Sequence, residues 1–148
     1  YFFFFVPATL SDFVWWSGLK ISDARAGLEM IKSNLVSETI GEQTYWFPNH
    51  FHFESQNSLH LLPAFDEFMV SYKDRTASLS ADHHQATITG NGIFKPIIVV
   101  NGKVEGIWKR TIQKDKVGIE TSIFTDPFDK AVLTTAINRY AQFLGKNI

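Results

Sequence analysis

The first apolar positions of the chain follow a helical period between two helix-end signals. Thr9 can cap a helix, with Asp12 three residues further on, as in a capping box. Phe13 and Trp16 then fall on one face. Ser17-Gly18-Leu19 interrupts the period, so we predict a short helix that ends at this turn.

A second short helix and a hairpin follow. Ser22 is the expected cap of a helix over residues 23–32, whose apolar positions recur at helical spacing. Residues 35–40 and 43–47 flank a Gly41-Glu42 turn and predict a β-hairpin. Two helices joined by a tight glycine-containing turn and followed by a hairpin are typical of a winged helix-turn-helix.

The middle of the chain predicts strands separated by polar segments. Residues 48–58 are rich in His, Asn and Ser and indicate a linker. The apolar runs 59–65 and 68–72 predict strands, and residues 80–86 predict a short helix capped by Ser80.

Asn101-Gly102 is the strongest hairpin signal in the sequence, because this pair suits a type I′ turn. It joins apolar runs at 93–100 and 103–113, and a further strand is predicted over 117–124. These strands predict an antiparallel meander that can close into a small barrel.

The last helix is predicted from its two ends. Asp126 is the expected cap, Pro127 the first position and Gly145 the stop, with an apolar stripe at helical spacing between them. The fold class is therefore α+β, a winged helix-turn-helix followed by a small antiparallel β-meander or barrel with a C-terminal helix. The predicted domains are residues 1–57 and 58–148.

Composition narrows the classes of function. The chain has 148 residues, 45% of them apolar and 20% charged, which indicates a folded protein. It has no cysteine, which excludes disulfides and thiolate metal sites and fits a cytoplasmic location. Its apolar start, residues 1–6, is too short to span a membrane. We expect no metal site and no cofactor, because the five histidines show no ligand spacing.

Positive charge is concentrated in one segment. The whole chain has a formal charge of −1, whereas residues 95–116 hold six basic and two acidic side chains, a net +4. We expect this segment to contact a polyanion. The candidate DNA-binding residues are Lys95, Lys103, Lys109 and Arg110.

Strand alternation distributes these cations between two faces. Arg110 shares the face of Val104, Trp108 and Ile112, while Lys103 and Lys109 lie on the opposite one. A guanidinium on an apolar face needs an anion, either a carboxylate of the chain or an external phosphate. Carboxylates and polar groups near this region define a candidate cleft, formed by Asp66, Tyr72, Asp74, Arg75 and Asn91.

Several of these segments together resemble one known family. The residues that carry the likeness are 7–13 with 16–19, 62–68 with 72–75, 90–96, 100–110 and 139–145. They resemble the AlkZ/YcaQ-like DNA glycosylases, bacterial winged-helix proteins that excise alkylated bases, including interstrand crosslinks. The resemblance implies winged helices and a β-barrel arranged around DNA.

The same resemblance implies where catalysis occurs. The family's catalytic element is a Gln-x-Gln or Gln-x-Asp motif in the N-terminal part, and we expect this chain to correspond to the C-terminal part without it. No catalytic residue is therefore assigned. If the whole protein is an enzyme, it is expected to be a hydrolytic DNA N-glycosylase.

Three functions remain open at this point. The first is a DNA-binding and scaffold portion of such a repair glycosylase, whose partners are damaged duplex DNA and a missing N-terminal domain of the same protein. The second is a non-enzymatic DNA-binding protein such as a transcriptional regulator, reading sequence through Arg25, Lys32 and Asn34. The third is a protein-interaction module, favoured by the 15% aromatic content.

Overall fold

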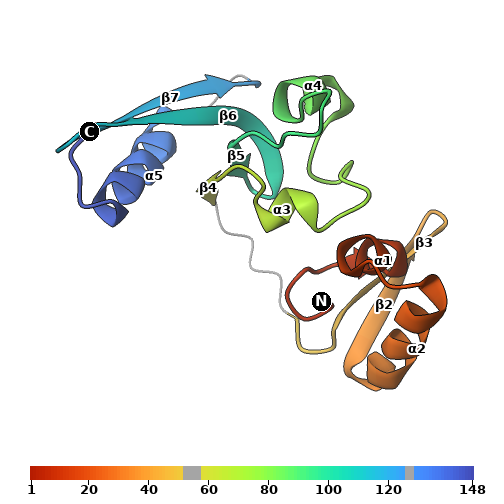
Figure 1. The fold of residues 1–148 in the computed structure, drawn as a ribbon. Coiled ribbons are helices and arrows are strands. Elements are labelled where there is room, and N and C mark those ends of the chain that lie inside the picture. The colour runs from red at the N-terminus through yellow and green to blue at the C-terminus, as the bar shows by residue number, and fades with distance from the viewer. Residues whose placement is uncertain (52–57, 126–128) are drawn as a thin grey trace. The chain divides into compact units, whose positions relative to one another are not determined.

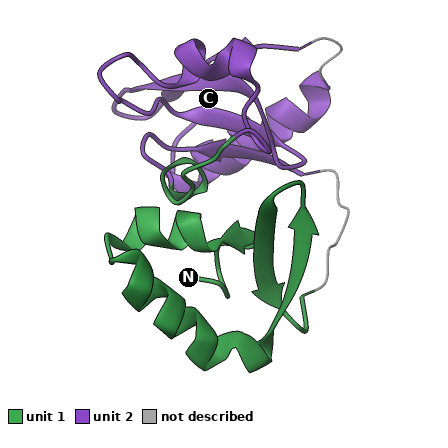
Figure 2. Cartoon of the chain, turned by 90° about the vertical axis from the view of Figure 1, so that its right-hand side faces the viewer, with its two compact units in different colours: residues 1–54, 67–75 green, residues 55–66, 76–148 purple. Residues whose placement is uncertain are grey.

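The computed structural model describes residues 1–51, 58–125 and 129–148 (Figure 1). The chain forms two compact units, coloured separately in Figure 2. Unit 1 comprises residues 1–54 and 67–75, and unit 2 comprises residues 55–66 and 76–148. None of the described helices is long and apolar enough to cross a bilayer.

Up to residue 48, unit 1 contains two α-helices and a three-stranded antiparallel sheet in the order β1-β3-β2. Its elements up to residue 48 are β1 (Ala8–Thr9), α1 (Leu10–Ser17), α2 (Ile21–Ile31), the 3-10 turn η1 (Lys32–Asn34), β2 (Leu35–Ile40) and β3 (Gln43–Pro48). The predicted helices and hairpin are all present. One cap differs, because α2 begins after Lys20 without a side-chain cap, and Ser22 bonds to Asp23 instead.

The ends of α1 follow from local chemistry. The Thr9 hydroxyl accepts from the Asp12 amide at 3.1 Å, and the Asp12 carboxylate accepts from the Thr9 amide at 2.9 Å, which is the predicted capping box. Gly18 ends the helix with a φ of 69°, a left-handed conformation in which glycine has no steric penalty.

The core of unit 1 lies between the helices and the sheet. Phe2, Ala8, Leu28 and Leu35 are buried there, and partly buried aromatic side chains pack around them. The ring of Tyr1 lies 5.4 Å from that of Phe13, centroid to centroid. The N-terminal aromatic run therefore contributes to the core of this unit.

Residues 67–75 correct a prediction. The expected strand over 68–72 is wrong, because Glu67–Val70 form the one-turn helix α3. This segment belongs to unit 1, where the Trp15 indole donates to the Val70 carbonyl at 3.1 Å and the Tyr1 hydroxyl to the Ser71 carbonyl at 2.7 Å. The two units therefore divide the chain differently from the predicted domains 1–57 and 58–148. Hydrogen bonds between residues so far apart in the sequence leave no signal in the pattern of apolar positions.

Unit 2 is built on a four-stranded antiparallel sheet in the order β4-β5-β6-β7. Its elements are β4 (Leu59–Leu62), the 3-10 turn η2 (Ala81–His83), α4 (His84–Thr87), β5 (Ile97–Val100), β6 (Lys103–Ile112), β7 (Val117–Ile123) and α5 (Lys130–Phe143). The predicted meander is present. The described strands form an open sheet, not a closed barrel, because β4 and β7 lie at opposite edges without pairing.

Helix α5 covers one face of this sheet. Leu133 packs there with Leu59, Ile98 and Trp108. Within the described residues the helix is capped by Asp129, whose carboxylate accepts from the Ala131 amide at 2.8 Å. The cap predicted at Asp126 and Pro127 lies outside the described residues. Gly145, with a φ of 63°, follows the end of the helix as predicted.

A β-bulge divides strand β6. Gly106 pairs with Ile98 and Val104 with Val99, so Glu105 has no partner in the ladder. The bulge moves Val104 to the face opposite Trp108, which corrects the predicted face of Val104. Gly106 also packs tightly, because a Cβ on it would lie 2.7 Å from the Ser122 carbonyl oxygen.

Candidate nucleic-acid interface

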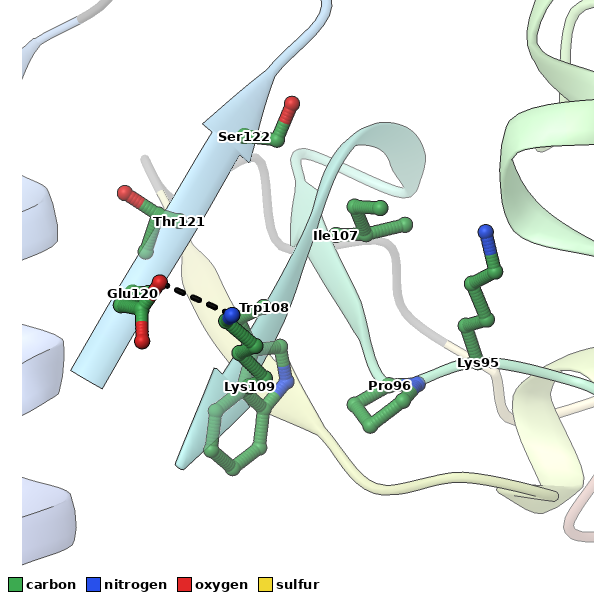
Figure 3. Close-up of a pocket in the computed structure, with 8 residues that line it drawn as sticks. All are labelled: Lys95, Pro96, Ile107, Trp108, Lys109, Glu120, Thr121 and Ser122. Atoms are coloured by element: carbon green, nitrogen blue, oxygen red, sulfur yellow. Dashed lines mark ion pairs between the residues drawn. The ribbon is translucent and has the colours of Figure 1, made fainter. Parts of the chain in front are cut away.

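The face of the sheet opposite α5 is covered only in part. Near the bulge, the His83 ring stacks on Phe124 with centroids 4.5 Å apart, and the Val104 amide donates to the Ser78 carbonyl at 2.8 Å. Beyond Gly106 this face forms an open hollow of about 380 Å³, drawn in Figure 3. Its lining consists of Lys95, Pro96, Ile107, Trp108, Lys109, Glu120, Thr121 and Ser122.

Strand pairing determines which charges enter this hollow. Lys109 lies directly opposite Glu120 in the β6–β7 ladder. The Lys109 ammonium and the Glu120 carboxylate form an ion pair at 3.0 Å, marked by the dashed line in Figure 3. The side chains are 71% and 66% exposed, so solvent screens this pair strongly.

Lys95 lies on another wall of the hollow. Its backbone amide donates to the Thr87 carbonyl at 3.0 Å, and its neighbour Pro96 accepts from the Trp108 amide at 3.1 Å. These two bonds hold the segment before β5 beside β6. Two of the four predicted cations, Lys95 and Lys109, therefore line the same hollow.

The other two predicted cations bind elsewhere in unit 2. The Lys103 ammonium donates to the Ala77 carbonyl. The Arg110 guanidinium donates to the Tyr140 hydroxyl, and its central carbon lies 5.8 Å from the centre of the Tyr140 ring. The structure thus supplies Arg110 with an aromatic hydroxyl of α5, and the four cations do not gather on one surface.

The hairpin tip is held by the chain itself. Asn101 has a φ of 48°, as the predicted turn requires. Its side-chain oxygen accepts from the Ser58 amide at 2.9 Å, and its own amide donates to the Ser58 carbonyl at 3.0 Å. The Asn101 side chain at the tip of this hairpin is therefore bonded to the residue that precedes β4.

The residues of the predicted cleft are divided between the two units. Tyr72, Asp74 and Arg75 belong to unit 1, whereas Asp66 and Asn91 belong to unit 2. Neither unit brings all five together. In unit 2, the Asn91 side chain accepts from the Thr89 hydroxyl within its own turn.

The buried carboxylate of Asp12 links the start of α1 to the segment 67–75 within unit 1. Asp12 is 3% exposed and accepts hydrogen bonds from the Thr9 hydroxyl at 2.7 Å and from the Lys73 amide at 2.9 Å. Burial, together with the Asp12 charge, raises the pKa of Tyr72 to about 12. Burial also lowers the pKa of Arg75, against the opposing effect of Asp12. The sequence identified Asp12 as a capping residue but gave no signal for its bond to Lys73.

The charges of helix α2 and of η1 balance, because residues 21–34 contain two acidic and two basic side chains. The Lys32 ammonium pairs with the Glu29 carboxylate at 3.0 Å and lies 5.5 Å from the centre of the Trp46 ring. Arg25 and Asn34 are exposed. One of the three side chains proposed for sequence reading is therefore already engaged within the unit.

Unit 2 contains one glutamine that lies two positions before an aspartate. The Gln-x-Asp spacing does occur once, at Gln113-Lys114-Asp115, which corrects the expectation that the chain has no such spacing. These residues are exposed in the turn between β6 and β7, where the Gln113 amide donates to the Lys116 carbonyl at 2.9 Å. Nothing among the described lining residues of the hollow comes from this turn. The described residues include no group of three His, Cys, Asp or Glu side chains arranged to hold a metal ion.

Each of the two units thus combines helices with an antiparallel sheet. The chain matches the family described as "DNA glycosylase AlkZ-like" over residues 1–143, and it belongs to that family. The resemblance predicted from its motifs is confirmed.

One solved structure extends the comparison to the fold. Streptomyces sahachiroi DNA glycosylase AlkZ is similar with a TM-score of 0.75 and 18% sequence identity, over 95% of this chain. The match covers 40% of that protein's chain. At this identity the likeness concerns the fold. No curated protein sequence matches the chain.

Proposed function

We propose that this chain is the DNA-binding and scaffold portion of a repair glycosylase that excises alkylated bases. The observation that carries the proposal is the family match over residues 1–143. The catalytic Gln-x-Gln or Gln-x-Asp motif would lie in an N-terminal part of the protein, outside this chain. The 40% coverage of the Streptomyces enzyme is consistent with a larger whole protein.

The proposed location is the cytoplasm, and two structural features support contact with duplex DNA. Unit 1 has two short helices followed by a hairpin, as a winged helix-turn-helix does. In unit 2, Lys95 and Lys109 line one open hollow, and the Lys109 side chain is 71% exposed. We assign backbone contacts to these two lysines. Lys103 and Arg110 are not among the residues that line this hollow, and we assign structural roles to their bonds with Ala77 and Tyr140.

Salt dependence tests this assignment. Each lysine that neutralises a phosphate adds about 0.9 to the slope of log affinity against log salt, because bound counterions are released. The variant K95A/K109A should bind a duplex more weakly and reduce that slope by about 1 to 2, depending on how far Glu120 occupies Lys109. The charge-matched variant K103A/R110A should change the slope by less than about 0.5.

Fluorescence anisotropy with a labelled duplex, between about 50 and 200 mM salt, provides both quantities. Equal slopes for the wild type and K95A/K109A would remove the hollow from the interface. An equal loss in both double variants would mean that overall charge, and not this hollow, determines binding.

A further inference from the structure

Glu120 is the acidic side chain in a hollow that otherwise attracts anions. It comes from β7 and faces Lys109 on the neighbouring strand, with 3.0 Å between carboxylate and ammonium (Figure 3). The three ionisable side chains that line the hollow, Lys95, Lys109 and Glu120, carry a net charge of +1 instead of +2. Glu120 therefore halves the positive charge available to a phosphate.

The same ion pair contributes little to folding. Exposed pairs of this kind stabilise proteins little, because water screens them and ordering two long side chains has an entropic cost. Stability alone thus gives a weak reason for a carboxylate at this position. A bound polyanion would meet this carboxylate directly, because a phosphate that reaches Lys109 must displace Glu120 and then lie beside its negative charge.

We propose that Glu120 is a specificity-determining residue that competes with DNA phosphate for Lys109. Its carboxylate weakens binding to ordinary duplex, so that stable binding needs contacts beyond the phosphate backbone. This is discrimination by an unfavourable interaction with the wrong partner. The inference rests on the proposed function, since it concerns the same hollow.

The decisive variant is Glu120→Gln, which keeps the size of the side chain and removes its charge. Affinity for an undamaged random-sequence duplex should rise about 3- to 10-fold at low salt, and the salt slope should steepen by about 0.9, the value for one more neutralised phosphate. Asp82→Asn changes the net charge equally at an exposed position in η2 and should raise affinity less than about 1.5-fold.

A double variant isolates the competition for Lys109. In a K109A background, Glu120→Gln should no longer steepen the slope, because the cation that it released is absent. An increase of the same size in both backgrounds would overturn the proposal, as would an E120Q affinity equal to that of D82N or lower than that of the wild type.

These outcomes separate the two proposals. If K95A/K109A leaves duplex binding unchanged, the assignment of the hollow to DNA fails. If K95A/K109A weakens binding and E120Q behaves like D82N, only the role of Glu120 fails. Equal denaturant midpoints for E120Q and the wild type would show that folding does not account for the difference.

Discussion

Replacing Asp12 should destabilise unit 1 more than replacing any exposed carboxylate of the chain. Its carboxylate is 3% exposed and accepts from the Thr9 amide, the Thr9 hydroxyl and the Lys73 amide at 2.9, 2.7 and 2.9 Å. In Asp12→Ala, two backbone N–H groups lose their acceptors. One half of the capping box of α1 is thereby lost, while the Thr9 hydroxyl can still accept from the backbone amide of residue 12.

The magnitude follows from these losses. A buried donor left without a partner costs about 1 to 3 kcal/mol. Since neighbouring effects do not add fully, we expect Asp12→Ala to lower the free energy of unfolding of unit 1 by about 3 to 5 kcal/mol. Whole domains are stable by only about 5 to 15 kcal/mol, so the change is large.

Urea denaturation followed by tryptophan fluorescence measures this effect, because Trp15, Trp16 and Trp46 all lie in unit 1. Asp12→Asn keeps one acceptor oxygen and should cost less, about 1 to 3 kcal/mol. Asp23→Asn is the matched control: this exposed carboxylate accepts only from the neighbouring Ser22 hydroxyl among the described residues, and should cost less than about 0.5 kcal/mol.

Hydrogen exchange adds a local readout. The Lys73 amide should exchange much faster in Asp12→Ala, because its acceptor is gone. The reasoning is refuted if Asp12→Ala unfolds within about 1 kcal/mol of the wild type. It is equally refuted if exchange at Lys73 is unchanged, since the bond between α1 and residues 67–75 would then not exist in solution.

Three further changes test other parts of the structure. The pKa of Tyr72 is raised by burial to about 12 from 10.0, so the folded state retains the phenol proton longer. This contribution is complete below pH 10.0 and is lost as the pH rises toward 12, so denaturant midpoints should fall over that window, and less so in Tyr72→Phe. Gly106→Ala places a Cβ 2.7 Å from a backbone oxygen and should destabilise unit 2 by about 2 to 4 kcal/mol, whereas Gly118→Ala, with its nearest contact at 3.9 Å, should cost less than about 1 kcal/mol in the same denaturation assay. Leu133→Ala should cost about 2 to 5 kcal/mol because the side chain is buried, while Phe143→Ala, 82% exposed on the same helix, should cost under about 0.5 kcal/mol; thermal unfolding that ranks them equally would contradict the packing of α5.

Local signals in the sequence determined much of the secondary structure. The capping box at Thr9 and Asp12 and the turn at Asn101-Gly102 were predictable because each depends on residues within a few positions. The ion pair between Lys109 and Glu120 was also accessible in principle, since the short turn between their strands sets the register that places them opposite each other.

The tertiary structure alone decided which residues come together over long distances. Residues 67–75 join unit 1 through bonds to Asp12, Trp15 and Tyr1, and the apolar pattern of that segment fits a strand equally well. The bulge at Glu105 places Val104 on the face of β6 opposite Trp108. A prediction from strict alternation of side chains along the strand cannot anticipate this change of face. Arg110 finds its partner on a helix 30 positions further along the chain. Sequence periodicity reports local backbone geometry, whereas these contacts depend on how distant elements pack against one another.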